Sequence, residues 1–148
     1  ARTDALTGLA IRTAVLERVH VWTSNAEEAD ALTAVLGLGE SAEAVARLVP
    51  PRAVVIVRDG PRGCVVRDPG AGGSVVEVAG YPQDAVDTNG AGDTHTGTLV
   101  AAWLSGLPWA QAARRANAAG AITVTRFGPD TAPTAREIDD FLAAQPAV

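Results

Sequence analysis

A glycine-containing turn directly precedes an apolar helix in the second half of the sequence. Residues 87–94, Asp-Thr-Asn-Gly-Ala-Gly-Asp-Thr, are followed by the apolar run 99–104, Leu-Val-Ala-Ala-Trp-Leu. Because Gly90 and Gly92 carry no Cβ, the backbone of this turn can approach a bulky anion closely. The unpaired N–H groups and the dipole at a helix N-terminus favour negative charge. The sequence therefore predicts an anion site at Gly90–Asp93.

Asp93 is expected in the first turn of this helix, beside the predicted anion site. A carboxylate at this place can accept the proton of a hydroxyl group that attacks phosphorus, as a general base does in phosphoryl transfer. Asp and Thr are also common in the first turn of ordinary capped helices. The pattern Gly-x-Gly-Asp alone therefore leaves that simpler interpretation open.

The rest of the chain alternates short apolar strands with helices. Strands are predicted at 19–23, 53–57, 64–66 and 74–78, and helices at 6–18, 42–48, 109–124 and 134–144. Two more helices are predicted: one is capped by Ser24 or Asn25 and runs through Val35, and the other follows the glycine turn and ends near Gly106. The run 53–57 is apolar throughout, which is typical of a strand buried on both faces. The glycine-rich segment 69–73 predicts the turn of an antiparallel pair. This alternation indicates an α/β fold without a long linker.

Composition excludes several classes of function. The net charge of −5 argues against a nucleic-acid partner. The twelve basic residues are all arginine, which excludes the Walker A loop, whose lysine contacts the phosphates. No apolar run approaches the ~18 residues of a membrane span. We therefore expect no membrane partner. The lone Cys64 has no partner for an internal disulfide, which suits a reducing compartment, so we expect a cytoplasmic protein. Because no methionine opens the sequence, we also expect a piece of a longer protein.

The motif at 87–94 resembles the second signature of the ribokinase/PfkB family of carbohydrate and nucleoside kinases, which usually reads Asp-Thr-x-Gly-Ala-Gly-Asp-Ser/Thr-Phe. His95 stands where the family usually has Phe, and because its side chain points away from Asp93 we expect a pocket wall or a packing residue rather than a catalytic base. The resemblance covers nearly the whole chain and implies a ribokinase-like three-layer α/β/α sandwich. It also implies an ATP-dependent kinase for a sugar or nucleoside. Asp93 would be its general base, and the turn Gly90–Asp93, with Ala91 and Gly92, its anion hole.

A second motif lies upstream. Asn25 and Glu28 follow a predicted strand and resemble the family's Asn-x-x-Glu motif, which helps organise Mg²⁺ and phosphate through water. One helical turn separates the two residues, so both can face one site. Oxygen donors that leave several waters in place suit Mg²⁺. The simpler structural explanation is a capping box, in which the same two residues close a helix N-terminus.

Two further segments resemble the nucleotide-binding parts of the family. Residues 57–64 resemble the motif Thr-x-Gly-x-x-Gly, with Gly60 and Gly63 matching and Arg58 replacing the threonine. In the family this loop lies along the phosphates and ribose, where Arg58 would supply positive charge. A solvated arginine and a glycine-based hairpin turn explain the segment equally well. The helix that carries Asn117 and Gly120 corresponds to the wall of the adenine pocket, although close helix packing also explains its small residues.

The resemblance implies further features of the complete protein. In many members a K⁺ ion lies beside the anion hole, held by backbone carbonyls, and the corresponding places are Asp87, Asn89 and the loop 125–131. Members are about twice as long as this chain. Residues 1–148 therefore correspond to the C-terminal nucleotide-binding and catalytic portion, and the N-terminal half, with its lid and most substrate contacts, is absent from the sequence. We expect Val54–Ile56 to be poorly covered without that half, and a homodimer of the complete protein is compatible with the resemblance.

Two other classes of function compete with a kinase. A dinucleotide-binding oxidoreductase needs a third glycine at position 95 and an acidic residue for the ribose, and the sequence has neither. A non-catalytic nucleotide-binding remnant or regulatory member of the same family stays open. Asp93, Asn25 and Glu28 are intact, which argues against such a remnant, whereas the missing half argues for it. The sugar or nucleoside that is phosphorylated is not encoded in this part of the protein.

Overall fold

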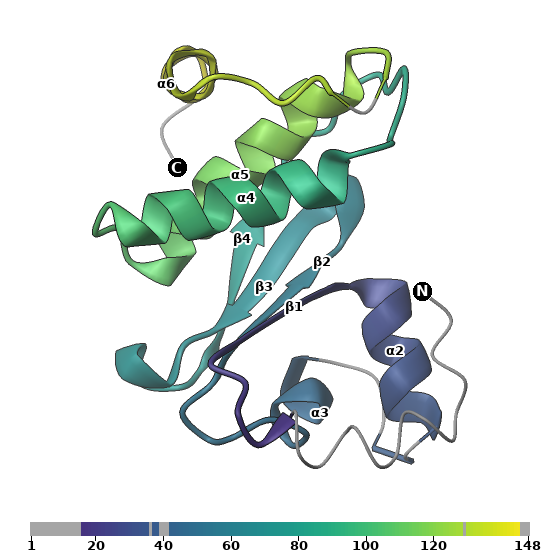
Figure 1. The fold of residues 1–148 in the computed structure, drawn as a ribbon, viewed down its shortest axis with the longest axis vertical. Coiled ribbons are helices and arrows are strands. Elements are labelled where there is room, and N and C mark those ends of the chain that lie inside the picture. The colour runs from purple at the N-terminus through teal and green to yellow at the C-terminus, as the bar shows by residue number, and fades with distance from the viewer. Residues whose placement is uncertain (1–15, 36, 39–41, 129, 146–148) are drawn as a thin grey trace. The chain divides into compact units, whose positions relative to one another are not determined.

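The computed structural model describes residues 16–35, 37–38, 42–128 and 130–145, and Figure 1 shows the ribbon. The chain divides into two compact units, one formed by Ala1–Val57 with Arg67–Val75 and the other by Arg58–Val66 with Val76–Val148. The strands follow one another across a four-stranded sheet in the order β1-β2-β3-β4. The helix predicted at 6–18 lies almost entirely outside the described residues.

The first unit contains two strands joined through helices. Its elements are β1 (Val21–Asn25), α2 (Ala26–Val35), α3 (Ala42–Ala46) and β2 (Val54–Arg58). The N–H of Val54 donates to the carbonyl of His20 at 2.9 Å, so the two strands begin side by side and run parallel. The side chains of Val54, Val55 and Ile56 are buried. Our expectation that they would be poorly covered is therefore wrong, because the chain's own residues remove them from solvent.

The second unit contains an antiparallel pair and three helices. Its elements are β3 (Gly63–Arg67), β4 (Val75–Ala79), α4 (Ala91–Leu104), α5 (Trp109–Val124) and α6 (Ala135–Ala143). The N–H of Asp59 donates to the carbonyl of Gly63 at 2.7 Å, which closes the turn into β3. The N–H of Gly80 donates to Arg62 at 2.9 Å and places the end of β4 beside the start of β3. This confirms the predicted antiparallel pair and makes the sheet mixed.

Helices α4 and α5 pack side by side (Figure 1). Small residues allow this close approach, since Ala112, Ala113 and Ala116 of α5 are completely buried, as is Leu99 of α4. The indole rings of Trp103 and Trp109 stack across the connection at 4.7 Å between centroids, with 14° between their planes. None of the described helices combines the length and the apolar character that crossing a bilayer requires.

Helix α6 packs on α5 through a separate apolar cluster. Ala118, Ala119 and Ile122 are buried together with Ile138 of α6. Phe141 of α6 meets Tyr81 edge to face, with 5.3 Å between ring centroids. The cluster positions the loop between α5 and α6, which is part of the candidate site.

Candidate active site at the start of helix α4

The first turn of α4 has the geometry of an anion site. Gly90 caps the helix with φ 77° and ψ −8°, a left-handed conformation that glycine adopts without strain. The N–H of Thr94 makes the first helical bond, to the carbonyl of Gly90 at 2.8 Å. In the described part of the chain, the N–H groups of Gly92 and Asp93 have no hydrogen-bond acceptor. Such N–H groups, together with the helix dipole, attract negative charge.

Asp93 lies in this turn with an exposed side chain. It lines a groove of about 1070 Å³ together with Asn89, Gly90 and Thr94. Residues of the α5–α6 loop and of α6 also line the groove: Ala132, Pro133, Ala135, Ile138 and Asp139. Among the described residues no ion pair or hydrogen bond engages the Asp93 carboxylate. The carboxylate is therefore open to a proton from a group bound in the groove.

Arg58 lies against the same turn. Its Nη1 donates to the carbonyl of Gly92 at 2.8 Å, and Thr96 Oγ1 donates to the same oxygen at 2.9 Å. A Cβ on Gly92 would lie 2.7 Å from Arg58 Nη1, so the absence of a side chain permits this approach. The structure thus brings together Arg58 and Gly92, two predicted site residues that are 34 positions apart in sequence. It places a guanidinium charge beside the anion turn.

The two glycines of the 57–64 segment differ in their surroundings. Gly63 has φ 106° and ψ −129°, and a Cβ there would lie 2.1 Å from the carbonyl oxygen of Val78. Just after the facing strand β4, a Cβ on Gly80 would lie 2.4 Å from the carbonyl oxygen of Pro61. Gly60 has φ 54°, and a Cβ there would have no atom of the described residues within 4 Å. Glycine is therefore required at position 63 by the close approach of the backbone at Val78–Gly80, whether or not the loop also binds a nucleotide.

Asp87 connects the signature segment to the α5–α6 loop. Its Oδ1 accepts from the N–H of Asn89 at 2.9 Å, and its Oδ2 accepts from the N–H of Gly128 at 3.1 Å. These backbone hydrogen bonds, that of Asn89 foremost, hold the pKa of Asp87 below its usual range. The structure thereby brings together the two segments that the resemblance assigned to K⁺.

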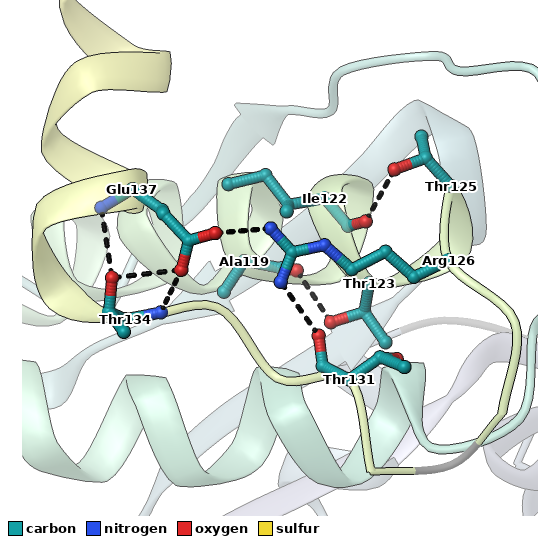
Figure 2. A network of polar contacts seen from close by, with 8 residues as sticks. All are labelled: Ala119, Ile122, Thr123, Thr125, Arg126, Thr131, Thr134 and Glu137. Carbon is teal, nitrogen blue, oxygen red and sulfur yellow. Dashed lines mark hydrogen bonds and ion pairs between the residues drawn. The ribbon is translucent and has the colours of Figure 1, made fainter.

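A polar network holds the far end of that loop, as Figure 2 shows. Arg126 Nη1 donates to the carbonyl of Thr131 at 3.2 Å, and Nη2 pairs with Glu137. The other carboxylate oxygen of Glu137 accepts from the N–H and the hydroxyl of Thr134, at 2.7 and 2.8 Å. The Thr134 hydrogen bonds and then Arg126 lower the pKa of Glu137 to about 2. Sequence reasoning missed this network, although Thr-x-x-Glu before a helix is a capping-box signal.

Asn117 and His95 meet beneath α4. Asn117 Oδ1 lies 3.0 Å from His95 Nε2, and both side chains are buried. Burial lowers the pKa of His95 to about 4 and raises that of the neighbouring Cys64 thiol to about 11. One turn after Asn117, a Cβ on Gly120 would lie 3.8 Å from the carbonyl oxygen of Ala91. This face of α5 therefore borders the first turn of α4, and the packing role expected of His95 is confirmed.

Asn25 and Glu28 belong to the first unit and form a reciprocal cap at the start of α2. The N–H of Asn25 donates to Glu28 Oε2 at 2.9 Å, and the N–H of Glu28 donates to Asn25 Oδ1 at 2.7 Å. Both residues are exposed. The capping box that the sequence left open is therefore present. One carboxylate oxygen of Glu28 takes part in it, and Oε1 makes no hydrogen bond with the described residues.

Comparison with known proteins identifies the family. The family model for pfkB family carbohydrate kinases matches residues 7–136. The chain belongs to this family. The match includes the α4 turn, the loop around Gly60 and most of the segment that carries the Arg126–Glu137 network. Membership confirms the resemblance that the 87–94 motif predicted.

Individual pfkB family relatives agree with this assignment. The chain is 41% identical over 90 residues to the ATP-dependent ribose-1-phosphate kinase of Halopiger xanaduensis, covering 61% of this chain and 29% of the relative. The crystal structure of ribokinase from Thermotoga maritima superposes with a TM-score of 0.78 at 25% identity, covering 95% of this chain and 48% of that one. A putative ribokinase II from E. coli in complex with ATP and Mg²⁺ has a TM-score of 0.73 at 29% identity, covering 89% and 42%. The ribokinase-like α/β fold is therefore confirmed, and the chain spans less than half the length of these relatives.

Proposed function

We propose that residues 1–148 are the C-terminal, nucleotide-binding and catalytic portion of an ATP-dependent kinase that transfers the γ-phosphoryl group to a hydroxyl of a sugar or nucleoside. The observation that carries this proposal is the first turn of α4. There, two N–H groups without an acceptor in the described chain lie beside the exposed carboxylate of Asp93. The family match and the E. coli relative in complex with ATP and Mg²⁺ support the nucleotide.

The roles of the residues follow from the chemistry of the turn. Asp93 accepts the proton of the acceptor hydroxyl as that oxygen attacks phosphorus. The N–H groups of Gly92 and Asp93 stabilise the charge on the transferring phosphoryl oxygens, because they are already oriented before the reaction, whereas the N–H of Ala91 donates to the carbonyl of Thr88 at 3.3 Å. Arg58 adds a fixed positive charge beside Gly92. Catalysis of this kind depends mainly on position and charge rather than on a strong base.

We assign Mg²⁺ and K⁺ to different donor atoms of the chain. Asn25 and Glu28 present exposed oxygen donors, which suit a magnesium ion that keeps part of its water shell. Mg²⁺ bound with ATP would neutralise phosphate charge. For K⁺, the backbone carbonyls of Asp87, Asn89 and the loop 125–131 are the proposed ligands. The bond from Gly128 to Asp87 supports this proposal because it holds the two segments together.

The nucleotide and the acceptor would occupy different parts of the complete protein. We assign the nucleotide to the loop Gly60–Gly63 and to the face of α5 that carries Asn117 and Gly120, since Arg58 and Gly120 both border the first turn of α4. We assign most acceptor contacts and the lid to the N-terminal half. The two substrates would then meet at the first turn of α4, with the phosphoryl group at the N–H groups and the acceptor hydroxyl at the Asp93 carboxylate.

The test is Asp93→Asn in the complete protein, assayed by ADP release with ATP, Mg²⁺ and a panel of sugars and nucleosides. We expect kcat to fall by about 10²–10⁴-fold because the general base is lost. The dissociation constant for ATP should stay within a few-fold, since the N–H groups remain. Asp140→Asn, an exposed change of the same charge on α6, is the control and should keep the wild-type kcat.

Two outcomes would contradict the proposal. An Asp93→Asn enzyme that keeps more than about half of the wild-type kcat would remove Asp93 from the mechanism, given the size of a general-base contribution. A wild-type protein that binds ATP but consumes none with any acceptor would favour the non-catalytic nucleotide-binding alternative.

A further inference from the structure

A buried polar contact joins α4 to α5 and, through Asn117 of α5, to the end of β4. His95 is 5% exposed and Asn117 8% exposed, and their Nε2 and Oδ1 atoms lie 3.0 Å apart. His95 does not line the groove that Asp93 lines. Buried polar side chains of this kind persist only where hydrogen bonds replace water.

The partners of Asn117 determine which imidazole nitrogen carries the proton. Asn117 Nδ2 donates to the carbonyls of Val78 and Ala79 at 3.0 and 3.1 Å, so the amide group faces β4 and its oxygen faces His95. An amide oxygen can only accept, and therefore His95 Nε2 must donate. Because burial lowers the pKa of His95 to about 4, the ring is neutral at pH 7 and Nδ1 is the unprotonated nitrogen. Among the described residues Nδ1 has no hydrogen-bond partner.

The contact lies between two rigid parts of the second unit. Val78 and Ala79 form the end of β4, which the close approach of Gly63 and Gly80 fixes against β3. His95 follows Asp93 by two residues on α4, so both belong to the first two turns of one helix. A displacement of His95 relative to β4 would therefore displace the Asp93 carboxylate and the anion turn as well.

We propose that His95 and Asn117 are a positioning pair, which holds the first two turns of α4 against the end of β4 and so sets the place of Asp93. The pair departs from the usual family motif, because the phenylalanine that usually stands at the place of His95 has no donor for the Asn117 oxygen. The kinetic consequence rests on the proposed kinase function. The structural consequence, a neutral His95 that donates through Nε2 and restrains α4, does not.

The structural consequence is tested without any substrate. Long-range ¹H–¹⁵N correlation spectra of the imidazole at pH 7 should show a protonated Nε2 and an unprotonated Nδ1. A protonated Nδ1 would overturn the proposal. By hydrogen exchange, His95→Leu should speed exchange of the backbone amides at 95–98 about tenfold, the size expected for the loss of one buried hydrogen bond. His95→Gln should stay close to the wild type, because glutamine Nε2 can donate from nearly the same place.

The kinetic consequence is tested with the same variants in the complete protein. For His95→Leu we expect kcat to fall about tenfold or more, since small misplacements of catalytic groups are costly, and KM for ATP to stay within about twofold. His95→Gln should restore kcat to within about twofold of the wild type, because it keeps the donor. An unchanged kcat in His95→Leu, or an equal loss in both variants, would overturn the pair.

The outcomes separate this proposal from the proposed function. A wild-type protein without kinase activity would contradict the proposed function, and the imidazole spectra and amide exchange would still decide whether the pair restrains α4. An active kinase with a charged or Nδ1-protonated His95 would overturn the proposed positioning pair and leave the proposed kinase function intact. If His95→Leu fails to fold, the imidazole spectra of the wild type and the kcat of His95→Gln decide whether His95 and Asn117 are a positioning pair.

Discussion

Replacing Gly63 by alanine should destabilise the protein far more than the same change at Gly60. Both glycines match the nucleotide-loop motif and both have positive φ, but only Gly63 lies against another backbone. A Cβ on Gly63 would lie 2.1 Å from the oxygen of Val78 and 2.4 Å from the nitrogen of Gly80. At Gly60 it would meet nothing within 4 Å among the described residues.

The two costs can be estimated separately. The conformation of Gly63, with φ 106° and ψ −129°, is one that alanine avoids, at a cost of about 1–3 kcal/mol. Forcing the end of β4 away from the new methyl group adds about 1–3 kcal/mol, as overpacking of a tight contact does. Gly60→Ala carries only the cost of a left-handed alanine, about 1–2 kcal/mol. We therefore expect Gly63→Ala to lower the free energy of unfolding by about 2 kcal/mol more than Gly60→Ala.

Urea unfolding followed by circular dichroism measures this difference directly, with both variants purified alongside the wild type. In thermal unfolding of the same variants, a 2 kcal/mol difference corresponds to roughly 4–8 °C between their melting temperatures, for a domain of this size. Equal free energies of unfolding for the two variants would refute the inference that β3 and β4 are in backbone contact at Gly63.

Two further predictions follow from the polar contacts. The pKa of Glu137 is held at about 2, below its usual 4.5, so this residue contributes stability that is fully present above about pH 4.5 and is lost as the pH falls through 2. We expect the free energy of unfolding of Glu137→Gln to fall less steeply with acid than that of the wild type or of the exposed control Glu43→Gln. Urea titrations between pH 6 and about pH 3 measure these three free energies. Parallel curves for the three proteins would contradict the prediction. Glu28→Gln should keep the cap on α2, since an amide oxygen accepts the same bond from Asn25, but should raise the Mg²⁺ concentration for half-maximal activity several-fold. An unchanged Mg²⁺ titration, with an unchanged unfolding midpoint, would leave Glu28 with the capping role alone.

Local patterns predicted the helices of the second unit closely. Helix α5 begins and ends where the sequence placed it, because Pro108 fixes its start and its alanine-rich stretch continues to Val124. Helix α6 is within one residue of its predicted bounds, since Thr134 and Glu137 close its first turn. Strand β1, in contrast, extends to Asn25 rather than ending at Thr23, because α2 follows it without an intervening loop.

The sequence predicted the residue types of the candidate site but not their partners. The glycine turn and Asp93 follow from a contiguous motif, whose geometry is local. The contact between Arg58 and Gly92 joins residues far apart in the chain, and no periodic pattern encodes such a pair. The same holds for His95 and Asn117. Their side chains meet because α4 and α5 pack closely, which depends on the whole helix–helix interface rather than on either segment.

The facing glycines also fix the alignment of the β3–β4 hairpin. Gly63 and Gly80 meet at the open end of the pair, far along the strands from the connecting loop 68–74. A slip of one residue would bring a side chain, from Arg62 or Cys64, into a space that admits only hydrogen. The contact at the open end thus determines the strand register. The length and sequence of the connecting loop can therefore change in evolution without shifting the strands.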